Sequence, residues 1–151
     1  MISSLRSFLL FGIFSFISYS YAGLGDEVKK IKDDKVLFKS QSLKITKKEN
    51  FSIHEIQVPE YKIREYVNSD RKVFAVAWSG FTHPQMKKVL SSYYDEFLEA
   101  AQKQKRTHGQ RFRVVKTKNL TVMISGHMRD LKGKAFLHEG LPLGVNAYEI
   151  R

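Results

Sequence analysis

Apolar and polar residues alternate in three consecutive runs near the middle of the chain. The runs cover residues 51–58, 61–67 and 72–80, and they are rich in the β-branched and aromatic side chains that suit a pleated surface. Pro59-Glu60 and residues 68–71 interrupt the runs with turn-forming chemistry. The pattern therefore predicts a meander of three antiparallel strands between Phe51 and Gly80.

The alternation also predicts which side chains share a face of this meander. Hairpins that close at Val58–Ile63 and Val67–Lys72 determine the parity, because side chains alternate along a strand. The predicted core face carries His54, Ile56, Val58, Ile63, Glu65, Val67, Phe74, Val76 and Trp78. The wetter face carries Glu55, Gln57, Lys62, Arg64, Tyr66, Val73, Ala75 and Ala77. We expect Trp78 to anchor the core and Glu55 to pair with Arg64 across neighbouring strands.

A helical pattern follows the meander. Apolar residues recur at i, i+3, i+4 and i+7 from Met86 to Ala101, with Thr82 as the expected N-cap and Gly109 after the end. Residues 111–116 and 120–125 then predict a hairpin, residues 134–138 a further strand and residues 145–150 a short closing segment. Strands, one long helix and strands again indicate an α+β fold, with an antiparallel sheet packed on one long amphipathic helix.

The first 22 residues have the pattern of a signal peptide. A short positive segment precedes the apolar run 8–17, and the small residues Ser20 and Ala22 fit cleavage after Ala22. No later apolar run is long enough to cross a bilayer, so we expect an exported protein, either periplasmic or secreted. Residues 23–50 are expected to form a lysine-rich arm with a short helix capped by Asp26 and an edge strand. A mobile charged arm is the alternative, and residues 51–151 are expected to form a single α+β domain.

Several short blocks occur in a fixed order along the chain. They are Leu24-Gly25, His54-Glu55-Ile56, Arg64-Glu65-Tyr66-Val67, the run from Val73 to Gly80, and Gly126-His127-Met128-Arg129. This order resembles a family of short exported bacterial proteins that is known only as a domain of unknown function. The resemblance implies a bacterial envelope or secreted protein. It transfers no catalytic residue and no cofactor.

Positive charge narrows the class of partner. The chain has 26 Lys and Arg against 15 Asp and Glu, a formal net charge of +11, and no cysteine that could form a disulfide. A run of cations without any acid contains Lys103, Lys105, Arg106, Arg111, Arg113, Lys116 and Lys118. Such a basic run attracts phosphate-bearing partners, here an anionic envelope polymer or lipid head groups. No nucleic-acid-binding module is recognisable, so nucleic acid is not an expected partner.

Four polar residues form a second candidate site: His54, Glu65, His127 and Arg129. No HExxH or similar spacing occurs, so we predict neither a metal site nor a catalytic residue. The first hypothesis is a non-enzymatic exported domain that binds an anionic envelope component through the basic run. The alternative is a small ligand-binding or enzymatic module that uses the four polar residues, which requires His54 and His127 to converge. A purely structural or assembly subunit is the third hypothesis.

Overall fold

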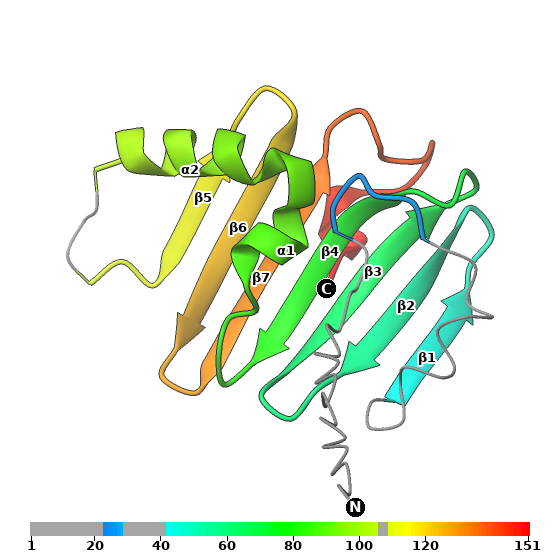
Figure 1. Ribbon diagram of the computed structural model, residues 1–151, viewed down its shortest axis with the longest axis horizontal. Coiled ribbons are helices and arrows are strands. Elements are labelled where there is room, and N and C mark those ends of the chain that lie inside the picture. The colour runs from blue at the N-terminus through cyan, green and yellow to red at the C-terminus, as the bar shows by residue number, and fades with distance from the viewer. Residues whose placement is uncertain (1–22, 29–41, 106–108) are drawn as a thin grey trace, which may run out of the picture.

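A computed structural model describes residues 23–28, 42–105 and 109–151 (Figure 1). Within these residues, seven strands form one antiparallel sheet: β1 (Ser42–Lys47), β2 (Phe51–Gln57), β3 (Tyr61–Asn68), β4 (Val73–Gly80), β5 (Phe112–Lys116), β6 (Leu120–His127) and β7 (Asp130–Leu137). Their order across the sheet is β1-β2-β3-β4-β7-β6-β5. The predicted meander, the later hairpin and the α+β class are confirmed. The edge strand that was expected before residue 50 is β1.

The predicted helical segment covers one face of the sheet (Figure 1). It consists of α1 (Met86–Leu90), a 3-10 turn η2 (Ser91–Tyr93) and α2 (Tyr94–Lys103). The break lies at Ser91, whose φ is 47° and whose hydroxyl donates a hydrogen bond of 3.0 Å to Asp26. The N-cap of α1 is Gln85 and has no side-chain cap bond, so the predicted cap at Thr82 is wrong.

The main hydrophobic core lies between the sheet and this helical segment. Its buried members come from β3 to β7, from both helices and from the N-terminal Leu24: Leu24, Ile63, Val67, Val73, Val76, Trp78, Val89, Leu90, Phe97, Val115, Leu120, Val122 and Ala135. Trp78 is only 3% exposed, and its Nε1 donates a hydrogen bond of 3.1 Å to His83 Nδ1. The prediction that Trp78 anchors the core is confirmed.

A second core cluster lies on the opposite face of the sheet. Its buried members are Tyr66, Phe74, Ala75, Ala77, Phe136 and Ile150, and the C-terminal segment with the 3-10 turn η3 (Ala147–Glu149) covers them. The face that was predicted to be wet is therefore apolar where this segment crosses it. Among the described residues, Lys62 and Arg64 on this face are about one-third exposed, at 34% and 36%.

The predicted faces are wrong for two residues, Val73 and Phe74. The register between β3 and β4 shifts at a bulge, because Tyr66 pairs with Ala75 while Val67 pairs with Val73. Phe74 is the extra residue, and the alternation reverses across it. Val73 therefore joins the main core, while Phe74 joins the second cluster beside Tyr66.

The N-terminal residues 23–28 lie against the sheet as a turn and a single bridge. Glu27 pairs with Lys72, and the Asp26 carboxylate accepts hydrogen bonds from the Gly23 N–H and from Ser91. Asp26 therefore does not cap a helix within residues 23–28, and the rest of the predicted helix and the predicted signal peptide lie outside the described residues. β7 starts at Asp130, four residues before the predicted strand. No helix in the described ranges has the length and apolar character to cross a bilayer.

Candidate functional site

A hollow of about 390 Å³ opens on the sheet face opposite the helices. Twelve residues line it: Lys62, Arg64, Ala77, Trp78, Ser79, Phe112, Met123, Ser125, Lys132, Gly133, Lys134 and Arg151. Five of these residues are cations, and none is an aspartate or a glutamate. We call this hollow the basic pocket.

Strand register explains why the hollow is there and why it is positive. Arg64 pairs with Ala77, which pairs with Lys134 on the other side, and the next row is Lys62, Ser79 and Lys132. β4 thus contributes two small side chains between two strands that carry long cations. Neighbouring strands lie about 4.8 Å apart, so the cations stand on strands about 10 Å apart on either side of the small floor.

Apolar side chains form the far side of the basic pocket. Met123 pairs with Lys134, and Ser125 pairs with Lys132, so β6 continues both rows. Phe112 pairs with Ser125 at the end of the second row and is 52% exposed. The basic pocket therefore has a cationic part over β3, β4 and β7 and an apolar part over β5 and β6.

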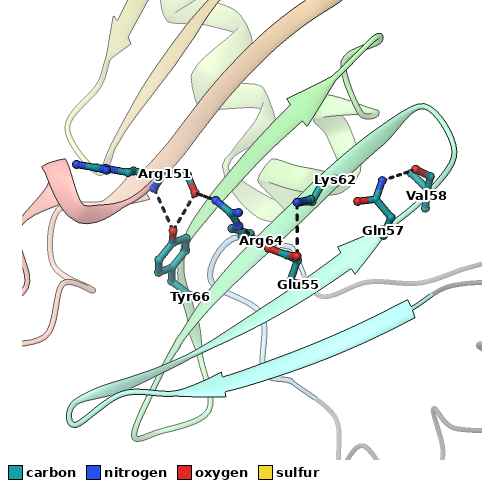
Figure 2. A network of polar contacts seen from close by, with 7 residues as sticks. All are labelled: Glu55, Gln57, Val58, Lys62, Arg64, Tyr66 and Arg151. Atoms are coloured by element: carbon teal, nitrogen blue, oxygen red, sulfur yellow. Dashed lines mark hydrogen bonds and ion pairs between the residues drawn. The ribbon is translucent and has the colours of Figure 1, made fainter.

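A polar network fixes one cationic wall (Figure 2). Arg64 Nε donates to Glu55 Oε2 at 2.6 Å, and Lys62 Nζ lies 3.6 Å from Glu55 Oε1. The hydrogen bond from Arg64, together with the positive charges of Arg64 and Lys62, holds the pKa of the Glu55 carboxyl below its usual value. The predicted ion pair between Glu55 and Arg64 is confirmed, and it orients Arg64 at the edge of the pocket.

The C-terminal segment closes one end of the basic pocket. The Arg151 carbonyl accepts hydrogen bonds from Arg64 Nη1 at 2.9 Å and from the Tyr66 hydroxyl at 3.0 Å (Figure 2). Lys134 Nζ donates to the carbonyls of Ala147 and Ile150 at 3.1 and 3.2 Å. Burial, and then the positive charge of Arg151, lower the pKa of the Lys134 ammonium. Lys134 therefore ties the segment to the sheet in addition to lining the pocket.

The structure does not bring the four predicted polar site residues together. His54 on β2 and Glu65 on β3 are directly paired, and both are buried on the face of the sheet that the helices cover. The prediction that these two residues share the core face is confirmed. His127 and Arg129 lie at the exposed β6–β7 turn. Three strands separate β2 from β6, which places His54 about 19 Å from the strand of His127. The described ranges also contain no group of three His, Cys, Asp or Glu residues that could hold a metal ion.

One cation of the predicted basic run, Arg113, supports the fold. Its guanidinium donates to the Ala101 carbonyl and, at 3.4 Å, to Gln104 Oε1. Gln104 in turn donates to the Val114 carbonyl at 2.9 Å. These bonds join the C-terminal end of α2 to β5.

The other cations of the basic run do not share one surface. Lys103 pairs with Glu99 at 2.6 Å, and Arg106 lies outside the described residues. The four remaining cations are exposed: Lys105, Arg111, Lys116 and Lys118. Side chains alternate along β5, so Lys116 faces the side of the sheet opposite to Arg113.

Sequence reasoning missed most of the cations that line the basic pocket. Lys132 and Lys134 are two residues apart in β7, and Ala77 and Ser79 are two residues apart in β4. The sequence alone therefore indicates that the members of each pair point to the same face of the sheet. The pairing of β4 with β7 joins strands about fifty residues apart, and no local pattern encodes it. The pocket therefore depends on a contact that the sequence alone did not predict.

The family comparison covers almost all of this architecture. A family model described as "Protein of unknown function (DUF2844)" matches residues 20–150. The chain belongs to the DUF2844 family. No curated protein and no solved structure matches the chain. The DUF2844 match includes every lining residue of the basic pocket except Arg151, so the pocket lies within the family domain.

Proposed function

We propose that this DUF2844 protein is an exported, non-enzymatic domain that binds an anionic envelope component in the basic pocket. The main support for this proposal is the lining of the basic pocket, which has five cations and no acidic side chain. Export is inferred from the signal-peptide pattern of the first 22 residues. The proposal keeps the anionic partner that the sequence suggested and moves its site from the basic run to the basic pocket.

The charges around the basic pocket leave a positive surplus. Glu55 balances part of the charge of Lys62 and Arg64, and Asp130 lies 3.2 Å from Lys132 Nζ. Neither acid lines the pocket, and five cations do. A phosphate or carboxylate above the small floor could accept charge-assisted hydrogen bonds from both walls at once. Such groups are common in envelope polymers and in lipid head groups, so the pocket suits either source.

Titration with soluble polyphosphate, followed by calorimetry, tests this proposal. The informative variant is Lys62→Gln/Lys132→Gln, because both lysines line the pocket and are partly exposed. Hydrogen bonds to charged groups contribute about 1.5–3 kcal/mol, and partial exposure favours the lower end for each lysine. We therefore expect at least about a tenfold loss of affinity, since about 1.4 kcal/mol corresponds to a factor of ten. Binding should also weaken with added salt.

Two comparison variants localise the effect. Lys87→Gln/Lys88→Gln removes the same charge from exposed positions of α1 on the opposite face, so it should leave affinity within about twofold. Lys116→Gln/Lys118→Gln tests the basic run at the β5–β6 hairpin. The proposal is wrong if the pocket variant binds as tightly as the α1 variant. A loss confined to the hairpin variant would return the site to the basic run.

A further inference from the structure

Three of the exposed large apolar side chains lie at or near one end of the sheet, and one of them, Phe112, lines the basic pocket. Phe81 is 63% exposed, Phe112 is 52% exposed and Met128 is 93% exposed. We call these three residues the apolar rim. Exposed apolar surface that is rimmed by polar residues marks protein–protein or membrane interaction sites. The basic pocket and the apolar rim together therefore favour a partner that has both anionic and apolar groups.

Strand register places the apolar rim at one end of the sheet. Gly80 and Gly126 both pair with Leu131, so the end of β4 and the β6–β7 turn that contains Met128 lie at the same end. Figure 1 shows this turn and the connection from β4 to α1 at that common end. Phe112, at the start of β5, pairs with Ser125 one position further along.

Phe81 follows β4 directly at this end of the sheet. Its N–H donates a hydrogen bond of 2.8 Å to the Glu60 carbonyl, which extends the β3–β4 ladder by one residue beyond Gly80. Phe81 therefore lies next to the row of Lys62, Ser79 and Lys132, which line the basic pocket. Phe112 thus lines the hollow from β5, and Phe81 lies just beyond the end of β4.

Charges at this end of the sheet favour an anionic surface. Lys62 and Lys132 line the pocket, and Arg129 in the β6–β7 turn is exposed. Within the described part of the chain, the acids Glu60 and Asp130 border the same end, and Asp130 is paired with Lys132. Cations attract a protein to anionic lipid head groups, and apolar side chains then enter the boundary between head groups and acyl chains.

We propose that the anionic partner is a lipid surface, on which this end of the sheet docks with the apolar rim inserted and the basic pocket over lipid phosphates. This inference rests on the proposed function and deepens it by naming the partner. A soluble acidic polymer offers no apolar phase and gives the apolar rim nothing to enter. A lipid surface satisfies both halves of the site, because phosphate and hydrocarbon lie within one head-group depth of each other.

Vesicle co-sedimentation of the full chain tests the inference. Vesicles of phosphatidylcholine mixed with phosphatidylglycerol are compared with vesicles of phosphatidylcholine alone, for the wild type and for two single variants. Met128→Ser removes a side chain of the apolar rim that is 93% exposed. Leu143→Ser is the control: Leu143 is outside the rim and 95% exposed, so the two side chains are matched in exposure. Leu143 lies by the β1–β2 turn, at the other end of the sheet.

The expected result is binding to the mixed vesicles that weakens about tenfold in Met128→Ser and not in Leu143→Ser. Phe81→Ser should weaken binding in the same way. Equal vesicle binding by Met128→Ser and Leu143→Ser overturns the insertion. Binding of polyphosphate through Lys62 and Lys132 without any binding to vesicles overturns the lipid partner and leaves the proposed function standing. Binding to neither probe overturns both proposals.

Discussion

Gly133 on β7 makes room for the sole tryptophan of the chain, and replacing it gives a sharp test of the sheet register. An ideal Cβ at residue 133 would lie 2.9 Å from Cη2 of Trp78 and closer still to Cζ2 and Cε2. Carbon atoms in contact lie about 3.5–4.0 Å apart, so Gly133→Ala forces the indole to move by more than about 0.6 Å. Trp78 is 3% exposed and belongs to the main core, so a displaced ring presses on buried neighbours.

The magnitude follows from two opposing contributions. Overpacking a core costs about 1–3 kcal/mol, and the ring contact argues for the upper end of that range. Alanine in a strand recovers about 0.5–1 kcal/mol relative to glycine. We therefore expect Gly133→Ala to lower the free energy of unfolding by about 2 kcal/mol. For a domain of this size that corresponds to a fall in Tm of about 7 °C.

Urea unfolding followed by far-ultraviolet circular dichroism measures this loss, and the emission of the single tryptophan reports the displaced ring. Gly109→Asn is the control, because a Cβ there meets no atom within 4 Å and asparagine tolerates the positive φ of 78°. The reasoning is refuted if Gly133→Ala keeps both wild-type stability and wild-type emission. It would then follow that Trp78 does not lie across β7.

Three further changes test other parts of the structure. Burial lowers the pKa of His54, and partial desolvation lowers the pKa of His83, so below about pH 6.5 the unfolded chain binds more protons than the folded chain. Urea unfolding should therefore show lower stability at about pH 5.5 than at about pH 7.5, and unchanged stability would contradict the desolvation of these rings. Glu55→Gln removes the carboxylate that pairs with Arg64, so calorimetry should show polyphosphate binding about threefold tighter at low salt. Weaker binding would argue against the basic pocket as the binding site. Tyr66→Phe removes the hydroxyl that is hydrogen-bonded to the Arg151 backbone, so the free energy of unfolding should fall by about 1 kcal/mol. The hydrogen of the Arg151 amide should also exchange faster with solvent. An unchanged exchange rate would show that this bond does not hold the C-terminal segment on the sheet.

Local patterns in the sequence predicted the parts of the fold that depend on local physics. Alternation around Ile63 and Val76 located the meander and its core face, since burial of one face is a period-two property. The helical spacing between Met86 and Ala101 located the segment that covers that face, although the break at Ser91 depends on a contact with Asp26 from far along the chain.

The errors have a common physical origin in contacts that periodicity does not encode. The bulge at Phe74 reverses the alternation by one residue, and turn chemistry gave no sign of it. The second apolar cluster exists because residues near Ile150 return across β3 and β4, which left the face of Tyr66 buried instead of wet. Each of these features is decided by tertiary packing.

The proposed site lies in a different place from the one that the sequence suggested. Charge counting indicated an anionic partner, and the proposal retains that partner. The run around Arg113 was the obvious location, but the alternation along β5 divides its cations between faces and the fold uses Arg113 itself. The basic pocket instead joins cations from β3, β7 and the C-terminal segment, which are neighbours only in the folded sheet.

Amide chemical-shift mapping tests the central claim most directly. The ¹⁵N-labelled protein is titrated with inorganic phosphate and then with a soluble short-chain phosphatidylglycerol, and the perturbed amides are placed on the sheet. The account predicts that perturbations gather on β3, β4 and β7 around Lys62, Ser79 and Lys132, and that the lipid also perturbs Phe81 and Met128. Perturbations confined to the β5–β6 hairpin or to the end of α2, or none at all, would contradict it.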